Sequence, residues 1–270
     1  MCQAVSGWFG SRATSLKNKL FLLSELLRRD LAARYGGSFA GPLWAVLNPA
    51  VFCALNAFVF AFVIKMKPPA GFRGGYVEFL LAGLLPWLGV QEAIMRATTS
   101  ISDQAHLVKK LRFPIHLLTA SAVGAALVVQ AIGMSLFTGF LLVTGRGSVN
   151  VGLLVAAFAF ECLLLAGPAL VLASLNVFFR DLAQLLPPFL MIAFYLSPII
   201  YPESMIPGFV ARFLAFNPLR DLLALFRAAL FGAPLPPFGR VAAWSVVLLV
   251  VGFVGARLFR RCRPSFADLL

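Results

Sequence analysis

The residues that could perform acid–base, nucleophilic or metal chemistry are few in this chain. It contains only two histidines, and its four cysteines form no CxxC pair. The HExxH, GxSxG and Walker A patterns do not occur, nor does a group of carboxylates with the spacing of metal ligands. We therefore predict no catalytic residue, no metal site and no cofactor or nucleotide bound by this chain itself.

A short basic segment is the most distinctive charged feature. HLVKKLRFP, residues 106–114, holds Lys109, Lys110 and Arg112 within four positions and ends on a Phe-Pro pair. Cations grouped in this way suit a solvated loop, a contact with anionic lipid or nucleic acid, or a docking site for another protein. The elements that surround the segment must decide among these possibilities.

The composition is that of an integral membrane protein. The chain has 270 residues, of which 61% are hydrophobic and 12% are charged, and its mean hydropathy is +0.92. In hydrocarbon the backbone must satisfy its own hydrogen bonds, and the apolar stretches lack the alternation of barrel strands, so we predict an all-α integral membrane protein. The net charge of +13 is then better explained by cytoplasmic Lys and Arg than by nucleic-acid binding.

Six stretches have the roughly 20 apolar residues that cross a bilayer. They lie at about 42–64, 77–95, 117–144, 151–178, 184–202 and 241–259. With six spans, 15 of the 23 Lys and Arg residues fall on one side of the membrane and 8 on the other. The positive-inside rule then predicts that both termini are cytoplasmic. No signal peptide is evident, so we expect the first span to stay in the mature protein.

Carboxylates inside these spans are costly and are therefore functional candidates. Glu92 precedes Arg96 by four residues near the cytoplasmic end of the second span, and Glu161 lies near the middle of the fourth. We interpret Glu92 and Arg96 as a structural ion pair near the interface. For Glu161, a structural and a functional role remain equally open.

One side of the first span alternates amides with aromatic rings. Asn48, Phe52, Asn56 and Phe60 recur every four residues and so lie along one side of a helix. They fit helix–helix packing with hydrogen-bonded amides, or the wall of a conduit for sugars, whose C–H faces stack on rings. The spacing alone favours packing.

Two further segments are predicted to be helices that do not cross the membrane. Residues 16–35 carry leucines at helical spacing from Leu16 to Leu31, which indicates an amphipathic helix in the cytoplasmic interface. Its Asp30 and Arg34 are four apart and can pair. Residues 218–231 follow an Asn-Pro cap, end before Gly232 and reach only about 21 Å. Together with the preceding segment, residues 205–216, they are expected to form a re-entrant helix pair on the extracytoplasmic side.

The chain resembles the ABC-2 membrane subunit of bacterial polysaccharide exporters, the permeases for O-antigen, capsule and teichoic acid chains. RDLAARYGGSFAGPLWAVLNP (29–49) resembles the family's entry into the first span, and HLVKKLRFP (106–114) resembles its loop before the third. LNVFFRDLAQLLPPFLMIAFYLSPIIYP (175–202) is similar to the fifth-span region, and IPGFVARFLAFNPLRDLLALFRAALFG (206–232) to the extracytoplasmic hairpin. The likeness covers about residues 20–260, and the order and spacing of the motifs are specific to the family.

This resemblance implies a type V exporter-like fold with six transmembrane helices per subunit, an N-terminal amphipathic interface helix, a cytoplasmic coupling helix and an extracytoplasmic re-entrant helix pair. It divides the chain into an N-terminal cytoplasmic segment (1–40), a six-span ABC-2 domain (41–260) and a cytoplasmic tail (261–270). The coupling segment maps to about 101–116 and the gate hairpin to about 203–232.

The resemblance also implies partners and site residues. The partners are a second copy of this chain, two copies of a separate ABC ATPase that binds ATP and Mg, membrane lipids, and a lipid-linked glycan. The glycan leaves through a channel lined chiefly by the first and fifth spans, for which the candidates are Asn48, Phe52, Asn56, Phe60, Phe194, Tyr195 and Ser197. Candidates for contact with the lipid diphosphate are Arg28, Arg29 and Arg34. Candidates for ATPase coupling are His106, Lys109, Lys110, Leu111, Arg112 and Phe113.

We therefore expect a permease subunit that exports a lipid-linked polysaccharide across the bacterial cytoplasmic membrane, driven by ATP hydrolysis in a separate subunit. An ABC-2 permease for a drug or lipid is the alternative, and a membrane-embedded enzyme or a non-transporting scaffold is a more distant one. In this setting the basic segment 106–114 is best interpreted as a coupling helix whose partner is a protein.

Overall fold

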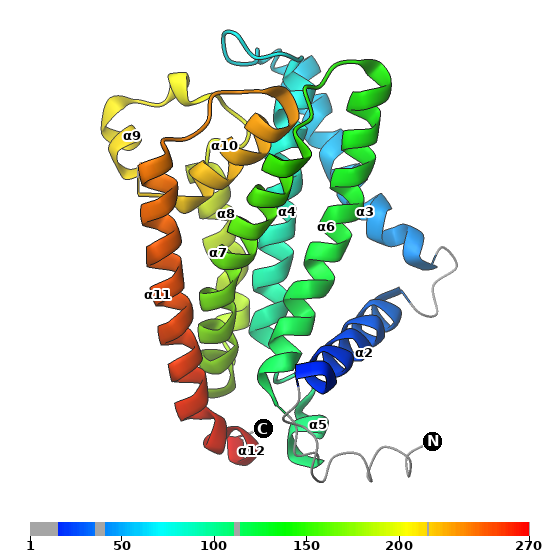
Figure 1. Cartoon of the computed structure of the whole chain (residues 1–270), viewed down its shortest axis with the longest axis vertical. Coiled ribbons are helices and arrows are strands. Elements are labelled where there is room, and N and C mark those ends of the chain that lie inside the picture. Colours follow the sequence, from blue (N-terminus) through cyan, green and yellow to red (C-terminus); the bar gives the residue numbers. More distant parts are fainter. Residues whose placement is uncertain (1–15, 36–40, 111–113, 215, 270) are drawn as a thin grey trace.

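The computed structural model describes residues 16–35, 41–110, 114–214 and 216–269, and the regular structure within these ranges is helical throughout. Long helices run along the longest axis of the molecule, and short ones lie at its two ends (Figure 1). The long elements are α3 (Trp44–Ala57, continued by the π-helix η2, Phe58–Val63), α4 (Tyr76–Thr99), α6 (His116–Thr144), α7 (Val151–Phe178) and α11 (Phe238–Cys262).

Five helical segments in the described part of the chain are long and apolar enough to cross a membrane. They are Trp44–Val63, Tyr76–Thr99, His116–Thr144, Val151–Phe178 and Phe238–Ser265, and they match the first, second, third, fourth and sixth predicted spans. The predicted fifth span, 184–202, is only partly helical. Its helix α8 (Leu182–Leu196) has 15 residues and a length of about 22 Å, less than the ~30 Å of a hydrocarbon core.

The early end of α8 has a local cause. Ser197 precedes Pro198, and a residue before proline is pushed out of the helical region by the proline ring. Ser197 is accordingly extended, with φ −101° and ψ 144°. The chain then turns through residues 198–202 toward the short elements η3 (Glu203–Met205) and α9 (Gly208–Leu214).

The spans differ in how much of their surface the subunit itself covers. In α4, 67% of the most apolar stretch is buried, because this helix packs against α6, α7, α8 and α10 (Pro218–Phe231). In Trp44–Val63 and Phe238–Ser265 only 11% is buried. The outer spans therefore leave broad apolar faces for lipid or for other protein chains.

Helix α10 is the short helix that the sequence places between the last two spans. It begins at the Asn217 cap, whose side-chain Oδ1 accepts from the Leu219 backbone N–H over 3.0 Å, and has Pro218 in its first turn. It ends at Gly232, which has a left-handed φ of 63° that glycine adopts without strain. All three signals were visible in the sequence, and the helix bounds confirm that prediction.

Helix α2 (Leu16–Tyr35) lies obliquely across the end of the bundle that also carries the C-terminal α12 (Phe266–Leu269) (Figure 1). Its predicted bounds are confirmed, and its buried side overlaps the predicted leucine stripe only in part. Leu26 is buried against the bundle, with Leu22 and Leu23 beside it, whereas Leu20 is exposed. The bundle thus covers a side of α2 centred on Leu26, with Leu23 and Leu27 of the stripe partly buried at its margin.

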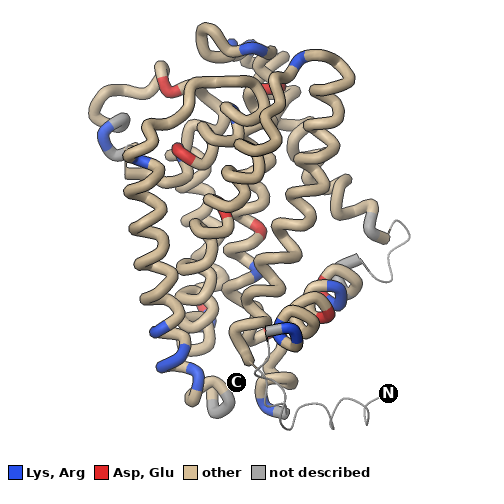
Figure 2. The backbone as a smooth tube through the Cα atoms, viewed as in Figure 1, with Lys and Arg blue, Asp and Glu red and all other residues tan. Residues whose placement is uncertain are grey.

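Lys and Arg gather toward the two ends of the bundle (Figure 2). The C-terminal end of α11 carries Arg257, Arg260 and Arg261, and α2 carries Lys17, Lys19, Arg28 and Arg29. This distribution suits a protein whose middle lies in hydrocarbon, because charged side chains are costly there.

Candidate functional site

The candidate channel residues of the first span lie on a largely exposed helix. Asn48 is exposed and Phe52 is 42% exposed, while Asn56 and Phe60 are partly buried. The Asn56 side-chain amide donates to the Phe52 backbone carbonyl over 2.9 Å, so this donor is satisfied within its own helix. Phe60 lies in the π-helical η2, where the turn is wider than in the α-helix that the four-residue spacing assumed.

A groove of about 870 Å³ separates α3 from α4 and α6. Asn48 and Phe52 line it from α3, and Gln91, Glu92 and Gln130 line it from the other side. Most of the remaining lining is apolar. The groove therefore combines aromatic and apolar walls with a few amides, which is the usual chemistry of a site for an amphipathic ligand.

Gln130, which lines this groove, belongs to a buried polar pair. Gln130 of α6 donates through Nε2 to Oε2 of Glu161 on α7 over 2.7 Å, and Glu161 is fully buried. Gly89 on α4 makes room for the pair, since a Cβ at that position would lie 1.7 Å from Gln130 Oε1. The Oε1 atoms of both Gln130 and Glu161 lack a hydrogen-bond partner among the described residues. The sequence singled out Glu161, but it did not identify Gln130 as its partner.

The fifth-span candidates divide into an exposed and a buried group. Tyr195 is 54% exposed at the end of α8. Phe194 is buried, with its ring centroid 5.7 Å from that of Trp87 on α4. Ser197 is fully buried, and its hydroxyl accepts from the Asn217 side-chain amide over 3.0 Å. Phe194 shares an apolar cluster with Cys53 of α3 and with several residues of α4. Helices α3 and α8 therefore both pack against α4 in this cluster.

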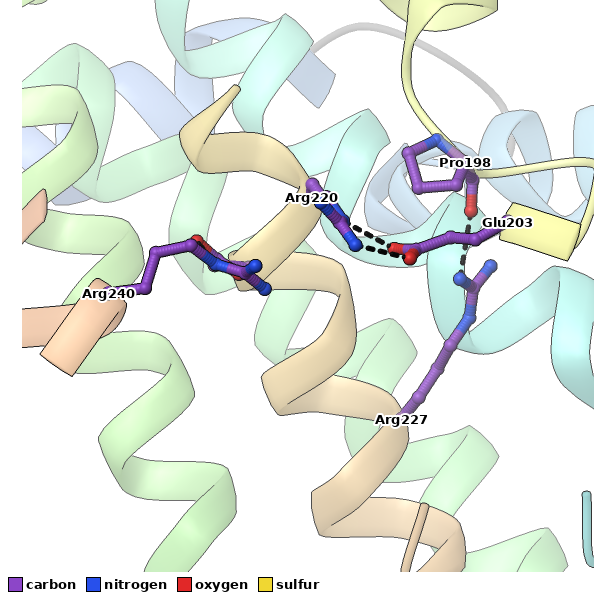
Figure 3. A network of polar contacts seen from close by, with 6 residues as sticks. Pro198, Glu203, Arg220, Arg227 and Arg240 are labelled. Carbon is purple, nitrogen blue, oxygen red and sulfur yellow. Dashed lines mark hydrogen bonds and ion pairs between the residues drawn. The ribbon is translucent and has the colours of Figure 1, made fainter. Parts of the chain in front are cut away.

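Helix α10 joins three other segments through polar contacts (Figure 3). Arg227 donates to the carbonyl oxygens of Pro198 and Ile199 over 2.8 and 3.0 Å, and its guanidinium carbon lies 3.7 Å from the centroid of the Phe79 ring. These carbonyls follow the end of α8, where no helical donor is available to them. Irregular backbone at membrane depth is stable only where the protein supplies such partners. Arg227 therefore holds the end of α8 in place.

Two ion pairs complete the α10 contacts. Arg220 binds Glu203 through Nη2 and Oε2 at 2.6 Å, and this carboxylate raises the pKa of Arg220 above its usual value. Arg240 of α11 binds the fully buried Asp221 through Nη2 and Oδ1, also at 2.6 Å. The partners of these two pairs lie 17 and 19 residues apart in the sequence, and only the fold identifies them.

The arginines proposed for lipid-diphosphate contact lie on α2. Arg28 is exposed, Arg29 donates to the Gln104 side-chain oxygen, and the side chain of Arg34 lies outside the described residues. Asp30 binds Arg96 of α4 over 3.0 Å, and its expected pairing with Arg34 concerns a side chain outside the described residues. Helix α2 crosses the end of α4, which brings Asp30 and Arg96 together.

The predicted ion pair of Glu92 and Arg96 is confirmed, with 2.5 Å between Oε1 and Nε. Asp30 binds the same arginine, so two carboxylates on different helices share it. This group fastens α2 to the end of the second span.

The coupling segment contains the short helix α5 (Ala105–Lys110) at the same end of the bundle as α2 and α12 (Figure 1). His106 and Lys109 are exposed, whereas Val108 packs in an apolar cluster with Leu26 of α2 and Phe266 of α12. Leu111, Arg112 and Phe113 lie outside the described residues, as does the side chain of Lys110. Helix α5 thus exposes polar side chains on one side and packs its apolar side against α2 and α12.

Phe266 is a residue that the sequence did not single out. It is fully buried, and its ring centroid lies 5.4 Å from that of Phe259 and 6.3 Å from that of Phe178. An aromatic residue near a basic C-terminus gives little signal by itself. The packing shows that the last residues close the cluster around α5.

Comparison with known proteins extends over nearly the whole chain. Residues 22–231 match the protein family described as "ABC-2 type transporter". The O-antigen export system permease protein RfbA of Myxococcus xanthus is 31% identical over 253 residues, which are 92% of this chain and 94% of that protein. RfbA of Klebsiella pneumoniae is 27% identical over 92% of this chain and 95% of its own length. The polysialic acid transport protein KpsM of Escherichia coli is 25% identical over 88% and 92% of the two chains.

Proposed function

This chain belongs to the ABC-2 type transporter family, and from that premise we propose that it is the permease subunit of a polysaccharide exporter. Its substrate is a lipid-linked glycan of the O-antigen, capsule or teichoic acid type. The observation that carries this proposal is the end-to-end likeness to permeases named for O-antigen export and polysialic acid transport. A multi-pass membrane fold without soluble domains among its described residues supports it.

The energy for export comes from a partner. We propose that two copies of a separate ABC ATPase bind ATP and Mg and dock at the end of the bundle that carries α2, α5 and α12. The exposed His106 and Lys109 of α5 offer polar contacts there, while Val108 fixes the helix to the bundle core. The chain itself performs no catalysis and holds no cofactor in this proposal.

The channel forms between two copies of the chain. Helices α3 and α8 carry exposed aromatic residues, including Phe52 and Tyr195, and both pack on α4. A face of this kind suits a passage for sugars, because rings stack on the C–H faces of the glycan and amides such as Asn48 meet its hydroxyls. Arg28 and Arg29 lie on α2, where they can meet the lipid diphosphate before it enters.

The orientation follows from charge. We propose that the chain lies in the bacterial cytoplasmic membrane with both termini inside the cell, since the end that carries α2 and the last turns of α11 is rich in Lys and Arg. The α9–α10 hairpin then lies on the outer side, above the end of α8, where it can gate the exit.

Two experiments test the function. Affinity purification of the full chain from its native membrane should recover an ABC ATPase, and failure to recover one under several mild detergents would contradict the permease assignment. Deletion of the gene should leave lipid-linked glycan trapped inside the cell, with reintroduction of the intact gene as the control. Normal surface glycan in the deletion strain, with the ATPase still associated in the parent strain, would point instead to an ABC-2 exporter of a drug or lipid.

A further inference from the structure

An apolar slot on the bundle lies outside the candidate channel. It has a volume of about 490 Å³ and is formed by α6, α7 and α11. Small and aliphatic side chains make up most of its lining, among them Ala120, Val123, Gly124, Ala166, Ala169 and Leu170. None of its lining residues is a carboxylate. The slot is therefore a hollow between helices that only an apolar group can fill favourably.

Basic side chains lie at one end of this slot. His116 in the first turn of α6 and Arg260 near the end of α11 are both exposed and line it. Lys19 of α2 and Arg263 lie close enough to act electrostatically on His116. Among the described residues, neither Lys19 nor Arg260 has a carboxylate within ion-pair distance. An apolar slot thus opens, where two spans end, beside Lys19 and Arg260, two cations without an ion pair to a carboxylate among the described residues.

We propose that this slot binds an anionic membrane phospholipid, with an acyl chain between α6 and α11 and the phosphate between Lys19, His116 and Arg260. Basic pockets between transmembrane helices are suited to anionic headgroups, and the slot volume lies within the ~300–1,000 Å³ of ordinary ligand sites. The charges lie at the end of the hydrocarbon span, which is the depth of a phospholipid headgroup. This site does not depend on which glycan the protein exports.

The bound lipid would join parts of the subunit that are separate in sequence. Lys19 belongs to α2, His116 begins α6 and Arg260 lies in the last turns of α11. One phosphate can accept hydrogen bonds from all three. Leu27 of α2 also borders this region, since a Cβ on Gly124 would lie 3.0 Å from Leu27 Cδ1. The lipid therefore stabilises the position of α2 against the bundle.

The first test concerns the headgroup and uses the purified full-length chain with phosphatidylglycerol as the probe. Native mass spectrometry counts the lipids retained as phosphatidylglycerol is titrated, with phosphatidylcholine as the neutral comparison. Arg260→Gln should weaken phosphatidylglycerol binding about fivefold, the equivalent of ~1 kcal/mol for one cation near the membrane surface. Arg257→Gln removes the same charge from an exposed position of α11 that does not line the slot, and binding should stay at the native level.

The second test concerns the acyl chain and does not require a charge change. Cys162 lines the slot and is exposed, so a membrane-permeant maleimide can report its occupancy in a variant whose other three cysteines, Cys2, Cys53 and Cys262, are replaced by alanine. Phosphatidylglycerol should slow the labelling of Cys162 several-fold relative to lipid-free detergent. Ala166→Phe fills the slot and should abolish this protection, whereas Val128→Phe, on an exposed part of α6 outside the slot, should preserve it.

Several results would overturn the proposal. Equal retention of phosphatidylglycerol and phosphatidylcholine would show that the cations do not select an anionic lipid. Competition by a polyprenyl-diphosphate lipid at lower concentration than phosphatidylglycerol would assign the slot to the transported substrate. A change from dimer to monomer in Ala166→Phe, without loss of bound lipid, would assign it to a second copy of the chain. None of these results bears on whether the protein pairs with an ATPase or exports glycan.

Discussion

At the scale of single residues, the buried pair of Glu161 and Gln130 bears on the structural and functional roles that the sequence left open for Glu161. Only one hydrogen bond joins the side chains, and one oxygen of each lacks a partner among the described residues. A buried polar group without a partner costs about 1–3 kcal/mol. The pair is therefore an expensive feature for packing alone, and substitutions of Glu161 can separate its structural contribution from any further one.

We expect Glu161→Gln to retain the native melting temperature, because glutamine keeps an acceptor for Gln130 Nε2 and adds a donor for its unpartnered oxygen. Glu161→Leu should lower stability by about 1–3 kcal/mol, since the Gln130 amide then loses its buried partner. Thermal unfolding in detergent measures both. Loss of transport in Glu161→Gln at unchanged stability would show that the carboxyl group itself is needed for function.

Arg227 acts on the backbone rather than on another charge. It supplies donors to two carbonyls that follow the end of α8, and Gly83 leaves the space for its guanidinium, since a Cβ there would lie 2.7 Å from Nη2. Arg227→Met should cost about 1–3 kcal/mol for each abandoned carbonyl. Hydrogen exchange should then rise at the backbone amides of residues 197 and 199–201, while Arg212→Met, at an exposed position of α9, should leave stability and exchange unchanged. Native protection of these amides in Arg227→Met would contradict this role.

At the scale of elements, the spans and their ends were largely readable from the sequence. Apolar runs of sufficient length and clear caps located the five long spans and α10 within a few residues. The polar contacts that hold these elements together could not be predicted from the sequence. Arg227, Asp221 and Gln130 all bind partners at least 19 residues away. Ser197 illustrates the same limit: the sequence placed it with the channel candidates, but the turn at Pro198 directs its hydroxyl to Asn217 inside the subunit.

The contact between α7 and α11 depends on glycine. A Cβ on Gly255 would lie 2.9 Å from the Gly167 carbonyl oxygen and 3.2 Å from Val171 Cγ2, so the two helices approach too closely for a larger residue. Gly255→Ala should destabilise the protein by about 1–3 kcal/mol. Gly252→Ala, on the same helix with nothing within 4 Å of the added carbon, is the matched control and should be neutral or slightly stabilising. Equal melting temperatures for the two variants would show that the helices can separate without cost.

At the scale of the whole molecule, the exposed faces indicate that one subunit is incomplete as a passage. The channel candidates Phe52 and Tyr195 lie on exposed parts of α3 and α8, and neither is enclosed by the described chain. A closed path for a hydrophilic glycan requires another surface opposite them, and under the proposed function a second copy of the same chain would supply it by two-fold symmetry. On the other side, α11 exposes mainly aliphatic residues, as expected for a helix that faces lipid.

This arrangement predicts a specific pattern of cross-links between copies. In a variant whose four native cysteines are replaced by alanine, Phe52→Cys and Tyr195→Cys should each give covalent dimers with a flexible bis-maleimide in intact membranes. Val250→Cys, which is 56% exposed on α11, should give no more than the cysteine-free background. Because all three side chains are similarly accessible in the single subunit, the difference reports which face meets the partner. Dimers formed through Val250→Cys alone would place the two-fold axis beside α11 and move the channel away from α3 and α8.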